Sequence, residues 1–355
     1  MSHVTLRRRL LAGAVLLLAP ALVLTAPNAA TAAPTRDRAE AGAGWLGRAL
    51  DKDDHVVTGQ FGPSYGQTAD VVLALAAAGV GRGKAAKATR ALKSHVVDYT
   101  GGGDQDEYYA GSFAKLLVVA AARDTDPRSF GRSLRNDLVA ELRGLECRPA
   151  TPGCARGDRG RFSDISQFGD FSSVISQSLA VLGLSRTTRR GPSRASVSYL
   201  LDQQCRNGAF PQDLGAGCSG SVDATGFAVQ ALAAVDTRAA RAAARDAGRW
   251  LARVQRRNGS FASDGVRNAN STALAAQALD VLDRSGRRAK AVRFLRSLQS
   301  RCGARPAVRG SLRFSRADAG DRVLATAQAV PALAGVTLVE VDKAGSTRSL
   351  PRLAC

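Results

Sequence analysis

Residues 250–279 read WLARVQRRNGSFASDGVRNANSTALAAQAL, and this stretch decides the fold. An aromatic residue, Trp250, is followed five positions later by Gln255, then by a turn that pairs Gly259 with Phe261, then by an alanine-rich run. The apolar residues on either side of the turn recur at the spacing of an α-helix. The stretch therefore predicts a helix, a loop and a second helix.

The same order of features recurs along the chain. Strong copies run over residues 199–232 and 294–330, and weaker ones over residues 44–75, 109–113 and 170–177. The residues that anchor the six copies are Thr68, Ser112, Ser172, Thr225, Thr272 and Val323. Their separations of 44, 60, 53, 47 and 51 residues average 51. Because a helical pair buries only one face, six pairs must stack, as an open superhelix or as a closed ring.

The composition agrees with a helical interior. Apolar residues make up 45% of the 355 residues, but aromatic residues only 5%, so the core must consist mainly of Ala, Leu and Val. No alternating strand pattern of useful length precedes residue 336, and 336–341 is expected to form one short strand. The fold class that follows is all-α.

The repeats resemble those of the terpenoid cyclase and protein prenyltransferase superfamily. Repeats of that superfamily join "FL..Q...G.F" to "D.T..AL.AL", and the resemblance covers roughly residues 40–335 of this chain. It implies an α/α toroid, the α6/α6 barrel, built from about six helical hairpins. Such toroids also occur in exported binding proteins, including the helical part of vitamin B12 carriers, so the resemblance implies the ring more strongly than any reaction.

The first 32 residues have the order of a secretory signal. Arg7, Arg8 and Arg9 precede an apolar run of about 15 residues, 10–24, which is shorter than the roughly 20 residues of a membrane-spanning helix. Small residues end at Ala32, where we expect cleavage and a secreted product; an uncleaved anchor is the alternative. The expected domains are the signal, a toroid over residues 33–335 and a tail over residues 336–355.

All six cysteines follow the signal, and in an exported protein disulfides are the default expectation. Loop spacing favours three pairs, the last of which ties the tail to the toroid: Cys147–Cys154, Cys205–Cys218 and Cys302–Cys355. A thiolate metal site is the alternative, but the chain lacks a Cys-x-x-Cys motif and has only three His. No metal and no cofactor are therefore expected.

In the toroids that the repeats resemble, the starts of the inner helices surround the mouth of a central cavity. The resemblance therefore implies that certain residues of this chain bind a ligand at the mouth. They are Tyr65, Thr68, Tyr109, Asp170, Phe171, Asp223, Asn270 and Asp321. The alternative is that the polar members only cap their helices.

Two catalytic interpretations follow from the same resemblance. Protein prenyltransferases hold zinc through Asp-x-Cys and a His, but Thr225 occupies the thiolate position here. Class II terpene cyclases use an Asp-x-Asp-Asp acid, and Asp51, Asp53 and Asp54 match that string, with His55 beside them. However, Lys52 within the motif favours ionised carboxylates, and few aromatic residues are available to stabilise a carbocation.

The charge is strongly positive but evenly spread. Fifty basic residues against thirty acidic ones give +20, and removal of the three signal arginines leaves +17. Neither a concentrated stripe with stacking aromatics nor a known module indicates nucleic acid, and an exported protein is expected to meet an anionic envelope component instead.

The sequence thus predicts a secreted, monomeric, disulfide-bonded toroid without stable membrane insertion. It would bind a small molecule or a cell-envelope component and would be non-catalytic. The alternative is a lipid-modifying enzyme of the cyclase or prenyltransferase type, with Asp53 or Asp54 as proton donor. A third interpretation is a structural or protein-docking surface, in which side chains would fill the cavity.

Overall fold

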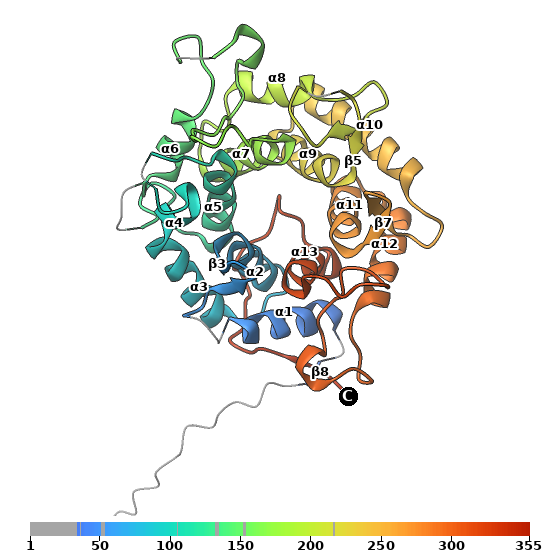
Figure 1. Ribbon diagram of the computed structural model, residues 1–355. Helices are drawn as coiled ribbons and strands as arrows, with labels where there is room; N and C mark the ends of the chain where they lie inside the picture. The colour runs from blue at the N-terminus through green and yellow to red at the C-terminus, as the bar shows by residue number, and fades with distance from the viewer. Residues whose placement is uncertain are drawn as a thin grey trace, which may run out of the picture. The chain divides into compact units, whose positions relative to one another are not determined.

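The computed structural model describes residues 34–35, 37–50, 54–104, 106–131, 135–151, 154–215 and 217–355. The compact unit Ala32–Cys355 contains a closed ring of six inner helices (Figure 1). They are α2 (Tyr65–Ala77), α5 (Ala110–Arg123), α7 (Val174–Thr187), α9 (Val222–Val235), α11 (Ala269–Val281) and α13 (Arg322–Ala334). Each packs on the next, and α13 returns to pack on α2. The predicted all-α toroid is confirmed.

The remaining helices lie outside this ring (Figure 1). They are α1 (Arg38–Ala49), α3 (Arg82–Ser94), α4 (Val96–Gly101), α6 (Leu138–Gly144), α8 (Arg194–Asp202), α10 (Arg238–Val254) and α12 (Ser285–Leu298). Helix α10 shows why they are outer helices: Ala240, Ala244, Ala247 and Leu251 are buried on one face, and its arginines lie on the other. Inner helices such as α11 are apolar on nearly all sides and can therefore be covered on all sides.

The repeated Gln of the outer helices joins neighbouring units. The Nε2 of Gln255 donates to Gly259 O in its own turn (3.2 Å) and to Arg287 O of the next outer helix (2.9 Å). Gln204 makes the same two bonds to Gly208 O (3.0 Å) and Ala243 O (2.8 Å). The bond to the turn glycine gives its carbonyl a partner, and the second bond joins the turn to the next outer helix.

Gln299 closes the ring in the same way. Its Nε2 donates to Gly310 O (2.8 Å) and to Arg38 O (2.9 Å), so the sixth unit is joined to the first. Helix α1 packs on both α13 and α2 at this seam. The signature that identified the repeat in the sequence is thus the contact that makes the repeats stack.

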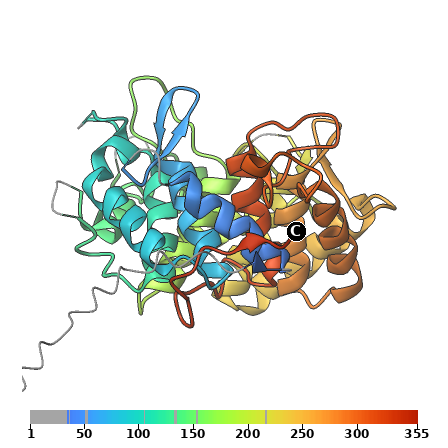
Figure 2. The ribbon, with the colours of Figure 1, turned by 90° about the horizontal axis from the view of Figure 1, so that it is seen from below.

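Short hairpins and loops lead into the inner helices. The hairpins pair β2 (Val57–Gly59) with β3 (Gly62–Ser64), β4 (Phe210–Pro211) with β5 (Gly220–Ser221), and β6 (Phe261–Ser263) with β7 (Val266–Asn268). Figure 2 shows β2–β3 projecting from one face of the ring. Two short 3-10 helices, η1 (Arg156–Asp158) and η2 (Pro306–Val308), lie in other connections.

The tail does not contain the predicted strand at residues 336–341. That segment is a turn in which Val341 N donates to Thr337 O (2.9 Å). The strand of the tail is instead β8 (Arg352–Leu353), which pairs in parallel with β1 (Pro34–Thr35). The apolar alternation at 336–341 reflects docking of the segment on the inner helices, where Leu338 and Val341 are buried.

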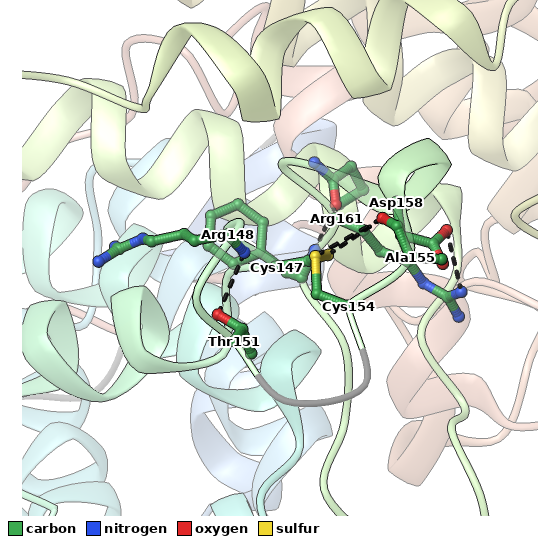
Figure 3. The surroundings of a disulfide bond; sticks show 9 residues. Cys147, Arg148, Thr151, Cys154, Ala155, Asp158 and Arg161 are labelled. Carbon is green, nitrogen blue, oxygen red and sulfur yellow. Dashed lines mark hydrogen bonds and ion pairs between the residues drawn. A yellow bond between two sulfur atoms is a disulfide. The ribbon is translucent and has the colours of Figure 1, made fainter.

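The three predicted cysteine pairs are bonded. The Cα atoms lie 5.3 Å apart in Cys147–Cys154 and 5.5 Å apart in both Cys205–Cys218 and Cys302–Cys355. Around the first pair, Arg148 N donates to Thr151 Oγ1 (3.1 Å), and Arg161 lies 3.7 Å from Asp158 (Figure 3). Cys205–Cys218 closes the loop between α8 and α9. Cys302–Cys355 links the tail to the loop after α12.

Candidate functional site

The lining of the central cavity includes one residue from each inner helix at equivalent positions: Asp70, Lys115, Leu179, Phe227, Leu274 and Gln328. In five of these helices, the lining residue lies two positions after the residue that accepts a hydrogen bond from the preceding loop or hairpin. Leu73, Gln277, Ala327 and Pro331 also line the cavity. Leu338 of the tail completes the lining, and the cavity measures about 30 Å³, enough for little more than one water molecule.

An ion pair occupies one side of this cavity. Lys115 Nζ lies 3.0 Å from Asp70 Oδ1. Burial by itself would lower the pKa of Lys115, but the negative charge of Asp70 outweighs burial and raises that pKa above its ordinary value. Nearby, burial raises the pKa of Tyr99, whose hydroxyl is close to both charges. The pair lies opposite an apolar wall formed by Leu179, Phe227 and Leu274.

The tail covers the end of the cavity at which the inner helices terminate, and Figure 1 shows its red trace crossing the ring. Leu338 N donates to Gln230 Oε1 (2.9 Å), while Arg186 donates from Nη1 to Leu338 O (2.7 Å) and from Nη2 to Val341 O (2.5 Å). Because these bonds are partly or fully buried, they fix Leu338 in the cavity lining. Access from solvent must therefore come from the other face, the mouth, where the inner helices begin.

Two predicted mouth residues present unpaired oxygen atoms. Asp223 and Asn270 lie four residues before Phe227 and Leu274, so they occupy the same helix faces one turn nearer the mouth. Asp223 Oδ1 and Asn270 Oδ1 are buried and have no hydrogen-bond partner among the described residues. Burial raises the pKa of Asp223, partly opposed by the Ser271 hydroxyl and reinforced by the charge of Asp264.

The other polar residues predicted at the mouth are engaged within the fold. Thr68 is fully buried: its Oγ1 accepts from Val57 N (2.9 Å) and donates to Ser64 O (2.7 Å). Thr225, Thr272 and Thr326 accept from the corresponding turns of their units. The predicted anchor Val323 is therefore offset by three residues from Thr326, the residue that performs this role.

Tyr109, Asp170 and Asp321 also have partners. Tyr109 donates from its hydroxyl to Glu107 Oε2 (3.1 Å), and Asp170 Oδ2 accepts from Arg161 Nη2 (2.6 Å). Burial would raise the pKa of Asp170, but the hydrogen bonds from Ser172 and from Asp164 N, together with the charge of Arg161, outweigh burial and lower it. Asp321 caps α13 by accepting from Leu324 N (3.0 Å). Tyr65 stacks on His95, with 5.1 Å between ring centres.

Apolar side chains are exposed on the hairpins and loops at the mouth. Phe171, which was predicted there, is 63% exposed; Phe61 at the β2–β3 turn is 95% exposed and Phe168 is 71% exposed. Ile165 and Val266 belong to the same set of loops. Sequence reasoning missed all of these except Phe171, although Phe61 and Phe168 each follow a polar residue and precede a glycine, a pattern typical of a loop tip.

The acidic string before β2 does not line the cavity where it is described. Asp54 is exposed, and His55 Nδ1 lies 3.2 Å from Leu50 O at the end of the outer helix α1. Asp51 and Asp53 lie outside the described residues. Within the described ranges, no three His, Cys, Asp or Glu side chains come together as a metal site would require, and no helix has the length and apolar character to cross a membrane.

Comparisons with known proteins support the same architecture. The family described as prenyltransferase alpha-alpha toroid domain matches residues 173–344. No curated protein matches the chain.

Among solved structures, the type II terpene cyclase MstE from Scytonema is similar, with a TM-score of 0.60 and 16% identity over 84% of this chain and 96% of that one. For ent-copalyl diphosphate synthase from Streptomyces platensis the values are 0.52 and 21%, over 77% of this chain and 52% of that one. For unsaturated glucuronyl hydrolase from Bacillus sp. GL1 they are 0.56 and 12%, over 84% and 95%. At these identities the similarity concerns the fold. Together with the domain match, it shows that residues 173–344 belong to the prenyltransferase alpha-alpha toroid domain family and that the chain has the alpha-alpha toroid fold.

Proposed function

We propose that the chain is an exported, non-catalytic binding protein whose ligand docks over the mouth of the toroid. The observation that carries this proposal is the size of the central cavity, about 30 Å³. Pockets that enclose a small molecule usually measure about 300–1,000 Å³. An isoprenoid chain therefore cannot be enclosed between the inner helices while Leu338 lines the cavity.

The chemistry of the mouth indicates the kind of ligand. Asp223 and Asn270 offer buried acceptor oxygens, and Phe61, Phe168 and Phe171 offer exposed aromatic faces on hairpins and loops that lead into other inner helices. A ligand that carries hydroxyl or amine donors would satisfy the acceptors, while its apolar face would cover the rings. A small molecule or the repeating unit of an envelope polymer has this character.

The enzymatic alternative lacks its acid in the described part of the cavity. Asp70 is the sole carboxylate among the described lining residues, and it forms an ion pair with Lys115, whose Nζ lies 3.0 Å from Asp70 Oδ1. A proton donor to an alkene must be neutral before it transfers its proton. The similarity to terpene cyclases therefore supports the fold of this chain and not their reaction.

Export is part of the proposal. Three disulfides are typical of proteins that fold in an oxidising compartment. The signal-like residues 1–32 lie outside the described residues, so their cleavage stays a prediction. N-terminal sequencing of the protein recovered from outside the producing cell should begin at Ala33; a chain that still begins at Met1 would contradict cleavage.

The binding proposal is tested by ligand capture. Immobilised protein, residues 33–355, is incubated with a cell extract, washed, and eluted for mass spectrometry of small molecules. A compound enriched by the wild type should be lost with the double variant Asp223→Ala/Asn270→Ala and retained by the control Asp202→Ala, which removes an exposed carboxylate from the end of α8. Equal capture by all three proteins would refute the mouth as the site. Conversion of geranylgeranyl diphosphate to a cyclised product would refute the non-catalytic role.

A further inference from the structure

A second hollow lies away from the mouth, around the loop that follows α7. Residues 187–191 separate two depressions of about 710 and 520 Å³, and Thr188, Arg189 and Arg190 line both. Arg128 and Arg143 line the first depression, and Arg194 lines the second. We call this double depression with its five arginines the arginine groove.

The charges in the arginine groove are poorly compensated. Arg189, Arg190 and Arg194 form no ion pair within the described residues, and Arg189 and Arg190 are exposed. Arg128 has only a long contact, 3.8 Å, with Asp137. Arg143 carries a buried Nε without a hydrogen-bond partner among those residues.

The acids close to the groove are occupied elsewhere. Glu146 is buried, lies 3.3 Å from Arg148 and accepts from the Ser193 hydroxyl. Asp124 lies 3.2 Å from Lys343 of the tail. Among the described residues, Arg128 is the groove arginine with acidic neighbours, since it lies 3.8 Å from Asp137 and its backbone N donates to Asp126 Oδ1 (2.9 Å). The five guanidinium groups of the groove therefore outnumber these two carboxylates.

The loop that carries the two central arginines is held in place. Arg143 Nη2 donates to Gly191 O (3.1 Å), and Gly191 N donates to Thr188 O (3.1 Å). Thr188 Oγ1 donates to Leu184 O (2.9 Å), which ties the loop to the last turn of α7. Binding would therefore require little ordering of the backbone, which lowers its entropic cost.

We propose that the arginine groove binds a linear polymer of phosphate groups. The guanidinium group of an arginine presents pairs of N–H donors, or forks, that bind an oxyanion through two parallel hydrogen bonds. A tetrahedral phosphate directs its oxygens to several sides, so two guanidinium groups can hold it at once, whereas a planar carboxylate matches one fork. Since Arg189 and Arg190 border both depressions, successive phosphates of one chain can occupy the two sides of the loop.

The test uses the protein of residues 33–355 with fluorescently labelled inorganic polyphosphate, and measures Kd by anisotropy at several salt concentrations. Arg189→Ser/Arg190→Ser should weaken binding by about tenfold or more. The slope of log Kd against log salt should also fall by roughly two, because two phosphate contacts are lost. The matched control is Arg256→Ser/Arg257→Ser, which removes the same charge from another exposed arginine pair and should change Kd less than about twofold.

Three outcomes would overturn the proposal. Equal weakening by both arginine pairs would show that the net charge of +17 is responsible. Equal affinity for poly-glutamate of the same length would contradict the selectivity for phosphate. No binding of polyphosphate at low salt would exclude the site. The mouth variant Asp223→Ala/Asn270→Ala should bind polyphosphate as the wild type does, so this result is independent of the function proposed for the mouth.

Discussion

At the scale of the residue, the amide of Gln299 performs the same task as those of Gln204 and Gln255, but across the seam of the ring. Its two bonds reach Gly310 O and Arg38 O, which are separated by most of the chain. The aromatic-x4-Gln spacing in the sequence identified these glutamines. It could not show that each amide spans two units, because the second acceptor belongs to a distant residue.

The first prediction concerns this amide. Gln299→Ala should lower the free energy of unfolding by about 2–3 kcal/mol, because the buried carbonyl of Gly310 loses its donor and the hydrogen bond to Arg38 O across the seam is lost. Urea unfolding under non-reducing conditions measures this change. Gln60→Ala, at an exposed hairpin position, serves as control and should remain within about 0.5 kcal/mol of the wild type. A loss at Gln299 no larger than at Gln60 would contradict the role of the amide at the seam.

The second prediction uses two carboxylates whose pKa values move in opposite directions. Burial raises the pKa of Asp223, so its charged form opposes folding: this contribution to stability falls as the pH rises above the unfolded value of about 4, through the folded pKa. Asp223→Asn should therefore be more stable than the wild type at neutral pH, and the gain should vanish in acid.

Asp170 should behave in the opposite way. Despite burial, hydrogen bonds from Ser172 lower its pKa, so it stabilises the fold above the unfolded value, and this stabilisation is lost as the pH falls through the folded pKa. Asp170→Asn should thus lose stability at neutral pH. Thermal unfolding of both variants across the pH range distinguishes the signs; changes of the same sign at neutral pH would refute this account.

At the scale of the element, the glycine turns decide how closely the outer helices approach. Gly259 has φ +89°, and a Cβ there would lie 2.1 Å from Lys290 O of α12. Gly265, in the β6–β7 turn, also has a positive φ, +77°, but a Cβ there would meet no atom within 4 Å. Both positions require a positive φ, which favours glycine, but only Gly259 lies against a neighbouring helix.

The third prediction follows from this pair. Gly265→Ala should cost about 1 kcal/mol through backbone strain alone. Gly259→Ala should cost at least about 2 kcal/mol more, because α12 must move away from the turn. Chemical unfolding of the two variants gives the difference. Equal losses would show that the approach of α12 is not limited by this glycine.

Several elements were predictable because local signals repeat. The last three units combine the aromatic, Gln, Gly and Thr signals, and their helices lie where the pattern placed them. In the second and third units, another residue occupies the position of the anchoring Thr. In the second unit this residue is Phe113, which is buried; in the third it is Gln177, which accepts from Phe162 N. Without the repeated residue, the anchors at Ser112 and Ser172 could only be approximate.

At the scale of the whole molecule, the cavity could not be predicted from the repeat. Periodicity indicates which positions face the centre, but the remaining volume depends on the sizes of all the lining side chains and on where the tail docks. The insertion of Leu338 depends on Arg186 and Gln230, which belong to different units. The sequence therefore predicted the ring, and it offered a filled interior only as one of three interpretations.

The fourth prediction concerns the disulfides of the ring. In the chain-entropy model, Cys302–Cys355, with a sequence separation of 53, should contribute about 4 kcal/mol, and Cys147–Cys154, with a separation of 7, about 2.5 kcal/mol. Replacing both cysteines of each pair by Ser and measuring urea unfolding tests the order of the two losses. A greater loss for the shorter loop would show that the tail contributes little to the closed ring.

The pairing of β1 with β8 and the bonds of Gln299 bring the two ends of the repeat array to one seam. An open solenoid can fold progressively, with each new hairpin resting on the one before it. In a ring, the first helical hairpin has no neighbour on one side until the last helical hairpin has been synthesised and has crossed the membrane. A protein threaded across a membrane from its N-terminus would thus complete its first interface last of all, and its passage would expose that flank to chaperones and proteases for as long as the transit takes.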